Sequence, residues 1–242
     1  MTYCLGILLS DGLVLASDSR TNAGLDLIWK ARKLAVFDEP GDRVIALLSS
    51  GDLATTQGVV TTLSQSFKNG DKADDLMAAK TLYDATAIIG ETLRRILGIE
   101  AQQTHPNGGP TAGFLVGGQI KGERPRLFEV YTNGKFIEAS PRTQFLQTGE
   151  TKYGKPILDR ALDFDMDLIR AAKFAMLSFD ATMRSNLSVA PPIDLLVYRR
   201  DSLVAEKRIK LTEDDPYLSE IRETYGRGLI GLVDGLPPPP GI

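Results

Sequence analysis

Residues 2–21 read TYCLGILLSDGLVLASDSRT, and this stretch decides the fold. Its two apolar runs, residues 2–9 and 12–18, are joined by a Ser-Asp-Gly turn, and Asp-Gly between apolar runs is typical of a β-hairpin. Both runs show little polar alternation, which is typical of strands that are buried on both faces. The stretch therefore predicts an interior hairpin that starts at the second residue and ends in a polar cluster at residues 17–21.

The rest of the chain continues this pattern and alternates between strand pairs and helix pairs. Hydrophobic periodicity and turn residues predict strands at 2–9, 12–18, 33–37, 43–48, 111–120, 125–131, 135–139, 143–149, 193–200 and 203–211, and helices near 53–67, 74–97, 151–162 and 167–183. Two antiparallel sheets packed face to face, with a helix pair on each outer face, would bury every apolar side of these elements. We therefore expect an α+β fold, a four-layer αββα sandwich.

The same pass along the chain predicts one domain. No linker-like composition divides the sequence, so residues 1–211 are expected to form the domain. Residues 212–242 are expected to be a C-terminal extension that is not a separate domain. Its end, GLPPPPGI, is typical of extended polyproline.

The bulk composition excludes several classes of function. Of 242 residues, 43% are hydrophobic and 24% are charged, as in soluble globular proteins. A net charge of −3 gives no footprint for nucleic acid, and a single cysteine fits a reducing compartment. With neither a secretory signal nor an apolar run of about 18 residues, we expect a cytoplasmic protein with no membrane partner.

Histidine is nearly absent, and this bears on the chemistry. The single histidine, His105, lies in QQTHPNGGP, whose composition is that of a loop. Ser-His-Asp, Cys-His and multi-histidine zinc sites would all depend on that one residue. The glycines of GFLVGGQIKG are not followed by a helix, so they form no dinucleotide motif. We expect no metal and no cofactor, and an enzyme with this sequence would use a base other than histidine.

Thr2 offers such a base. Initiator methionine is generally removed before a small residue, and loss of Met1 would leave an α-amino group, with an unperturbed pKa of about 7.7–8.0, on the residue that carries the hydroxyl. That amine can take the hydroxyl proton and activate threonine as a nucleophile. The hairpin would bring Asp18 beside it, and Lys33 opens the next strand, where a cation would lower the pKa of both groups. The alternative is that Met-Thr has no catalytic meaning and that Asp18 and Lys33 form an ordinary surface pair.

These residues lie in segments with a family resemblance. DGLVLASDSRTNAG, KARKLAVF and IALLSSGDLATTQ, placed after the N-terminal threonine, resemble the opening of proteasome β-type subunits, in the N-terminal nucleophile hydrolase superfamily. MTYC, SDSRTNAGLD, FDATMRSNLSV and PPIDLLVY are similar, more narrowly, to Anbu, the bacterial ancestral β-subunit group. The resemblance covers roughly residues 2–200. It implies the αββα sandwich, a threonine-type peptidase, and self-assembly into a ring or an open spiral.

The resemblance also implies roles, position by position. They are Thr2 as nucleophile, Asp18 as partner of the catalytic Lys33, Gly51 as the source of the oxyanion-hole N–H, and Arg20 and Thr21 as contacts to the substrate backbone. Lys33 requires one residue fewer in the preceding loop than the family has, and Lys30 is the competing candidate. Gly51 also has an independent argument, because a glycine at a strand-to-helix junction can present a backbone N–H.

Two further matches depart from the family pattern. Thr148, in Gln-Thr-Gly, stands where proteasome subunits have the serine of Gly-Ser-Gly. Ser185 stands where they have the aspartate of Arg-Asp-x-x-Ser, and Ser188 retains the serine. Asp180 is the alternative if the alignment is shifted. A hydroxyl at Ser185 in place of a carboxylate would stabilise the charged form of the Thr2 α-amino group less well.

The sequence therefore predicts a threonine peptidase that hydrolyses peptides or unfolded proteins within a homo-oligomer. Two alternatives stay open: an amidase of the same superfamily that acts on small molecules, and an assembly or binding protein that has kept the fold and lost efficient catalysis. No ATPase motif is present, so any unfoldase would be a separate partner. The extension after residue 212 is a candidate for packing on a neighbouring subunit.

Overall fold

The computed structural model describes residues 2–23, 27–69, 74–101 and 111–241, so Met1 and His105 lie outside the described residues. The strands are β1 (Tyr3–Leu9), β2 (Gly12–Asp18), β3 (Arg20–Ala23), β4 (Leu27–Lys30), β5 (Leu34–Glu39), β6 (Arg43–Gly51), β7 (Ala112–Ile120), β8 (Arg126–Val130), β9 (Phe136–Glu138), β10 (Phe145–Gly149), β11 (Ile193–Arg199) and β12 (Lys207–Leu211). The helices are α1 (Leu53–Asn69), α2 (Leu82–Ala101), α3 (Lys155–Ala161), α4 (Leu168–Ser185) and α5 (Pro216–Asp234).

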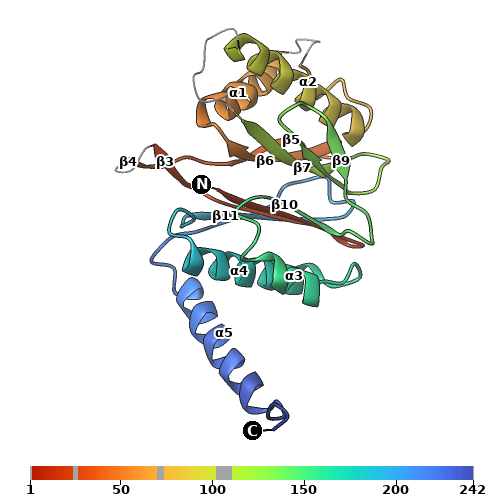
Figure 1. Cartoon of the computed structure of the whole chain (residues 1–242). Helices are drawn as coiled ribbons and strands as arrows, with labels where there is room; N and C mark the ends of the chain where they lie inside the picture. The colour runs from red at the N-terminus through yellow and green to blue at the C-terminus, as the bar shows by residue number, and fades with distance from the viewer. Residues whose placement is uncertain (1, 24–26, 70–73, 102–110, 242) are drawn as a thin grey trace.

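Two five-stranded antiparallel sheets form the two inner layers. Their strand orders are β10-β1-β2-β11-β12 and β5-β6-β7-β8-β9. Helices α1 and α2 cover the outer face of the second sheet, and α3 and α4 cover the outer face of the first (Figure 1). The αββα sandwich that the sequence predicts is confirmed. In the part of the chain that the structure describes, each helix is too short or too polar to span a bilayer.

The first hairpin lies in the interior, as predicted. Every residue of β1 and β2 is buried. Alternate residues of β1 enter different cores: Leu5 and Ile7 pack in the layer shared with α4, whereas Cys4 and Leu8 pack between the two sheets. Because successive side chains of a strand point to opposite faces, both faces of this strand are covered and both must be apolar.

A short hairpin after the polar cluster was not predicted. β3 and β4 form a separate two-stranded sheet in which Arg20 is opposite Lys30. The sequence predicts no strand between residues 19 and 32, because β3 and β4 are each only four residues long and too short to show a periodic pattern. The hairpin brings the end of β2 next to the start of β5.

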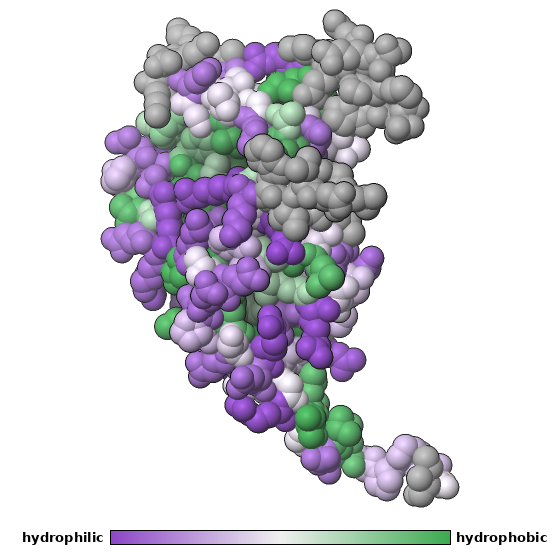
Figure 2. Space-filling view, turned by 90° about the vertical axis from the view of Figure 1, so that its left-hand side faces the viewer, coloured by the Kyte–Doolittle hydropathy of each residue, from purple (hydrophilic) through white to green (hydrophobic). Residues whose placement is uncertain are grey.

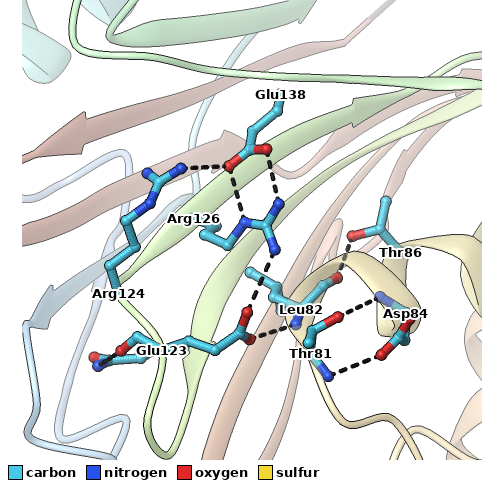
Figure 3. Close-up of polar contacts among 9 residues, drawn as sticks. Thr81, Leu82, Asp84, Thr86, Glu123, Arg124, Arg126 and Glu138 are labelled. Carbon is cyan, nitrogen blue, oxygen red and sulfur yellow. Dashed lines mark hydrogen bonds and ion pairs between the residues drawn. The ribbon is translucent and has the colours of Figure 1, made fainter.

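The second helix begins later than predicted. Residues 74–81 form turns, and α2 starts at Leu82 rather than near residue 74. The side chain of Asp74 pairs with Arg95, which holds the preceding segment outside the helix. Thr81 and Asp84 then exchange side-chain to backbone hydrogen bonds, each of 3.1 Å, which is a capping box at the helix start (Figure 3).

The C-terminal extension contains a helix that the sequence analysis did not assign. α5 spans Pro216–Asp234 and runs away from the sandwich (Figure 1). The side chain of Asp215 caps it by accepting from the Tyr217 N–H at 3.0 Å. Pro216 in the first turn has the fixed φ that favours helix initiation. Asp215 and Pro216 are a helix start signal in the sequence. The proline run at the end of the tail led instead to the prediction of an extended segment.

Candidate active site

The N-terminal strand places Thr2 at the edge of a cleft. The Thr2 carbonyl accepts a hydrogen bond from the Glu150 N–H at 2.8 Å. Gly149 lies opposite Tyr3 with a φ of 88°, and a Cβ there would lie 1.9 Å from the Thr2 oxygen. Only glycine allows β10 to approach this closely. The end of β10 therefore fixes the position of the Thr2 backbone.

The side chain of Tyr3 secures the same strand from its other face. Its hydroxyl lies 2.6 Å from Ser178 Oγ on α4 and accepts from Gln147 Nε2 on β10 at 2.5 Å. Burial raises the pKa of Tyr3 to about 12, so this hydroxyl keeps its proton at neutral pH. The start of β1 is thus tied to both its neighbouring strand and its covering helix.

Asp18 and Lys33 form an ion pair in the interior. Lys33 Nζ donates to Asp18 Oδ1 at 2.7 Å and to the Arg20 carbonyl at 2.6 Å. The side chains are 0% and 6% exposed. The same carboxylate accepts from the Tyr3 N–H at 2.9 Å and the Arg20 N–H at 3.1 Å. The carboxylate therefore fixes the lysine, the first strand and the end of β2 together.

The charge state of Asp18 reflects opposing influences. Burial raises the pKa of its carboxyl above the usual value, while the Lys33 ammonium and the two backbone N–H groups act in the opposite direction. A buried carboxyl of this kind retains its charge only with such partners. Lys33 is therefore the group on which the ionised state of Asp18 depends.

A pocket of about 420 Å³ brings Thr2 and Lys33 together. Its lining is Thr2, Thr21, Lys33, Ser49, Ser50, Gly51, Leu53, Thr56, Gly149 and Glu150. Four residues that the sequence analysis selected, Thr2, Thr21, Lys33 and Gly51, line this one cavity. Within the described ranges, Thr21 Oγ1 is buried without a hydrogen-bond partner. A hydroxyl, an ammonium and a glycine backbone around one cavity are the groups that acyl transfer requires.

Gly51 lies at the junction of β6 and α1, as the sequence indicated. Its φ is 101°, and a Cβ would lie 2.1 Å from the Thr111 carbonyl oxygen. Asp52 follows and accepts from the Thr55 N–H at 2.9 Å, which is the hydrogen bond of a helix N-cap. The backbone therefore turns at Gly51 in a conformation that side chains with a Cβ rarely adopt.

Arg20 and Thr148 support the pocket without lining it. Arg20 Nη1 donates to the Leu187 carbonyl at 2.7 Å, while its own carbonyl accepts from Lys33. Thr148 Oγ1 lies 2.8 Å from Ser50 Oγ and lines a neighbouring cavity of about 160 Å³. Thr148 is thus one hydrogen bond away from a residue of the pocket.

The α4 candidates lie outside the pocket lining. Ser185 is exposed at the end of α4, and Ser188 is half-buried with its N–H donating to Asn186 Oδ1 at 2.9 Å. The alternative Asp180 is buried and pairs with Arg222 of α5 at 3.2 Å. Lys30, the competing lysine, is exposed and lines a different cavity. Of the two lysines considered, Lys33 is the one that contacts Asp18.

Sequence reasoning missed several pocket residues. Ser49 donates through Oγ to the Lys33 carbonyl at 3.3 Å, and Glu150 has a side chain only 12% exposed. Glu150 directly follows the Gln-Thr-Gly segment that was examined for Thr148, so its place beside Thr2 was available as a signal. Ser50 gives no such signal, because its role depends on contacts across two sheets.

Comparison with known proteins identifies the family of the chain. A profile of the proteasome subunit family matches residues 2–197. No curated protein matches the chain.

Three solved structures are similar over nearly the whole length. The Anbu (ancestral β-subunit) protein from Yersinia bercovieri is 43% identical with a TM-score of 0.92, and the alignment covers 98% of each chain. The helical assembly of the Anbu complex from Pseudomonas aeruginosa is 48% identical with a TM-score of 0.92, covering 99% of this chain and 98% of that one. A Gly-1 mutant of Anbu from Hyphomicrobium sp. strain MC1 is 42% identical with a TM-score of 0.91, covering 98% and 99%. The chain therefore belongs to the proteasome subunit family and, within it, to the Anbu proteins, with the N-terminal nucleophile hydrolase fold.

Proposed function

We propose that this protein is an N-terminal threonine peptidase that acts after removal of Met1. The observation that carries the proposal is the single pocket in which Thr2 and the Lys33 ammonium meet, with Asp18 buried behind the lysine. The Thr2 hydroxyl attacks the peptide carbonyl carbon, and the α-amino group takes the hydroxyl proton. The peptide C–N bond then breaks, the leaving amine receives that proton, and an ester to Thr2 remains. Water hydrolyses the ester and restores the hydroxyl.

The surrounding residues have distinct roles in this scheme. Lys33 is the nearby cation that lowers the pKa of the Thr2 amine and hydroxyl, and Asp18 keeps Lys33 charged and oriented. The Gly51 N–H stabilises the oxyanion that forms on the carbonyl oxygen. The peptide backbone binds along Arg20 and Thr21. Thr21 Oγ1, which has no hydrogen-bond partner among the described residues, supports a polar contact there.

The remaining predicted residues, Thr148, Ser185 and Ser188, act on the site indirectly, by positioning residues around the pocket. Thr148 positions Ser50 through the 2.8 Å contact between their hydroxyls. Ser188 and Ser185 support the α4 side of the site without a carboxylate. Turnover is therefore expected to be slow, because Ser185 supplies no carboxylate where the family pattern has an aspartate.

We also propose that the chain works as a homo-oligomer, in a ring or an open helical arrangement. One similar structure is described as a helical assembly of the Anbu complex. The second half of α5 carries exposed Leu229, Ile230, Leu232 and Val233. In this proposal residues 1–211 are the catalytic domain, and residues 212–242 are an arm that packs on a neighbouring subunit.

The decisive experiment combines intact mass with covalent labelling. Purified protein is treated with a peptide epoxyketone, a reagent that needs both the threonine hydroxyl and its free amine. We expect a mass that lacks Met1, one adduct on Thr2, and no adduct on Thr2→Ala. Thr56→Ala, which changes another hydroxyl of the same pocket, serves as the matched control and should still be labelled.

The outcomes separate the alternatives. Active protein that retains Met1 would rule out the mechanism. Processed protein that resists labelling would favour an assembly or binding protein. Labelled protein that hydrolyses acylated small amines but not fluorogenic peptides would favour the amidase.

A further inference from the structure

A second cavity, of about 360 Å³, is lined by Ser19 and Arg32, the sequence neighbours of Asp18 and Lys33. The residues of its lining that matter here are the cations Lys30, Arg32, Arg208 and Lys210 and the polar Ser19 and Asp194. Four cations thus face one carboxylate in a chain whose net charge is −3. The local excess of positive charge is a property of this cavity and not of the composition.

Three of these four cations make no ion pair in the part of the chain that the structure describes. Arg208 pairs with Asp38 at 2.9 Å. Lys30, Arg32 and Lys210 make no ion pair with any residue that the structure describes. Like charges gathered around one concavity repel one another, and a bound anion removes that repulsion. The cavity therefore has the positive charge expected of a site that binds an anion.

Asp194 narrows the choice of anion. It is 6% exposed, and its carboxylate accepts from Ser19 Oγ at 3.1 Å. An ionised carboxylate has about four lone-pair positions, so further donors can bind there. An anion without a proton is repelled by this carboxylate, whereas an anion that carries an O–H can donate to it. Hydrogen phosphate carries such a proton at neutral pH, and sulfate does not.

We propose that this cavity binds a singly protonated phosphate group, with the cations holding its charged oxygens and Asp194 accepting its proton. The phosphate can be free or carried by a small organic molecule. A cavity of this volume lies in the size range of small-molecule sites. The buried Leu34 and Leu195 offer apolar surface to an organic part.

The position of the cavity connects it to the active-site backbone. Ser19 directly follows Asp18, and Arg32 directly precedes Lys33. The Ala31 N–H donates to the Ser19 carbonyl at 2.9 Å, which joins the two segments. A phosphate bound in this cavity therefore contacts the chain segments that carry Asp18 and Lys33, but it lies in a different cavity from the Thr2 pocket.

Isothermal titration calorimetry on the full chain tests the inference without any measurement of peptidase activity. The titrants are inorganic phosphate, ribose 5-phosphate and sulfate, at constant ionic strength in a buffer without phosphate. We expect phosphate to bind at least tenfold more tightly than sulfate. Ribose 5-phosphate distinguishes a phosphate monoester from free phosphate as the natural ligand. If the natural ligand is a monoester, ribose 5-phosphate should bind more tightly than inorganic phosphate. Its affinity should then rise as the pH falls towards the second pKa of the monoester, about 6.

Matched variants assign the contacts. Lys210→Met should weaken phosphate at least tenfold, whereas Lys207→Met, an exposed lysine of the same strand outside the cavity lining, should leave it unchanged. Asp194→Asn should bring the affinities for phosphate and sulfate within about threefold of each other, because an amide can donate to sulfate.

Three results would overturn the proposal. They are no phosphate binding by the wild type, equal losses in Lys210→Met and Lys207→Met, and an unchanged preference in folded Asp194→Asn. If Asp194→Asn does not fold, the preference of the wild type and the two lysine variants, both at exposed positions, still decide the question.

Discussion

At the scale of single residues, the buried carboxylate of Asp18 holds the site together. It receives hydrogen bonds from Lys33, from the Tyr3 N–H and from the Arg20 N–H. A surface ion pair contributes little because water competes for both partners. Here the Asp18 and Lys33 side chains are only 0% and 6% exposed, so removal of Lys33 leaves an uncompensated carboxylate in the interior.

Lys33→Met should therefore reduce stability as well as activity. Loss of one member of a buried ion pair costs about 3–5 kcal/mol, and urea unfolding followed by circular dichroism measures it. Adding Asp18→Asn should recover part of the loss, since the isolated charge is then gone. A Lys33→Met protein as stable as the wild type would contradict the buried pair.

Gly51 gives a second prediction at this scale, with a control in the same strand pair. Gly51 and Gly41 both have positive φ, of 101° and 81°, but a Cβ at Gly41 would meet no atom within 4 Å. Gly41→Ala should cost about 1 kcal/mol from the backbone alone, and Gly51→Ala clearly more, about 3 kcal/mol, because the Thr111 carbonyl must move. Equal midpoints in thermal unfolding would contradict the close contact at Gly51.

Sequence reasoning works best for site residues that are close in the chain. Asp18 could be placed beside Thr2 because the β1–β2 hairpin brings those strand ends together. Lys33 was chosen through the family resemblance, and the β3–β4 hairpin that brings it to Asp18 was not predicted.

Ser50 could not be assigned, because its position depends on the stacking of two sheets. Glu150 was within reach of sequence reasoning, because it directly follows the Gln-Thr-Gly segment that contains Thr148. Arg20 was expected to contact the substrate, but its side chain does not line the pocket. Its guanidinium donates to the Leu187 carbonyl and its own carbonyl accepts from Lys33, so it joins neighbouring segments.

At the scale of elements, a surface charge cluster links the second sheet to the start of α2 (Figure 3). Glu138 on β9 accepts from Arg126 on β8 at 2.8 Å and from Arg124 at 3.0 Å. Arg126 also pairs with Glu123, whose other oxygen accepts from the Leu82 N–H at 2.7 Å. The cluster therefore satisfies a backbone donor of the first helical turn.

This cluster makes stability depend on pH in a predictable direction. The hydrogen bonds from Arg126 are the main reason that the pKa of the Glu138 carboxyl is lowered. A lowered carboxyl pKa contributes stability above the unfolded value, about 4.3, and that contribution is lost as the pH falls through the folded value. Glu138→Gln should be less stable than the wild type at pH 7 by about 1 kcal/mol, with the difference disappearing in acid.

The control is Glu206→Gln, which removes an exposed carboxylate with no ion pair among the described residues. Urea unfolding at a series of pH values compares the three proteins. If the Glu138→Gln difference stayed constant down to pH 3, the contribution would not come from the ionised carboxylate.

The elements that sequence patterns missed are those without apolar periodicity. The sandwich strands could be placed because burial imposes long apolar runs. β3 and β4 are only four residues long, too short to show a periodic pattern. The start of α2 depends on the side-chain contacts of Asp74 and Thr81. The helix α5 as a whole was missed for another reason: its capped proline start is followed by Gly226, Gly228 and Gly231, which weaken the helical signal of the sequence.

At the scale of the whole molecule, the core contacts of α5 among the described residues lie in the first half of the helix. Leu218 is buried, and Arg222 reaches Asp180 of α4. Beyond this point the helix leaves the body (Figure 1), and apolar side chains gather near its lower end (Figure 2). An exposed apolar surface of this kind is typical of a protein–protein contact.

Charge placed on that surface should therefore disrupt assembly without unfolding the domain. Leu229→Asp combined with Val233→Asp is expected to give a smaller particle in multi-angle light scattering than the wild type. Arg227→Asp, which adds negative charge on the same exposed turn but removes no apolar group, should keep the particle size. A chain ending at residue 211 should match the double variant, and wild-type size in either would contradict the role of the arm.

The positions of the two chain ends limit how the protein can be tagged for purification. Residues fused before Thr2 would start at the wall of the 420 Å³ pocket and would replace the amine there. A fusion at the other end would extend the arm beside its apolar surface. The turn between β5 and β6 is a better place for an affinity epitope, because a Cβ at Gly41 would meet no atom within 4 Å. Purification through that turn would leave both ends of the chain in their native chemical form.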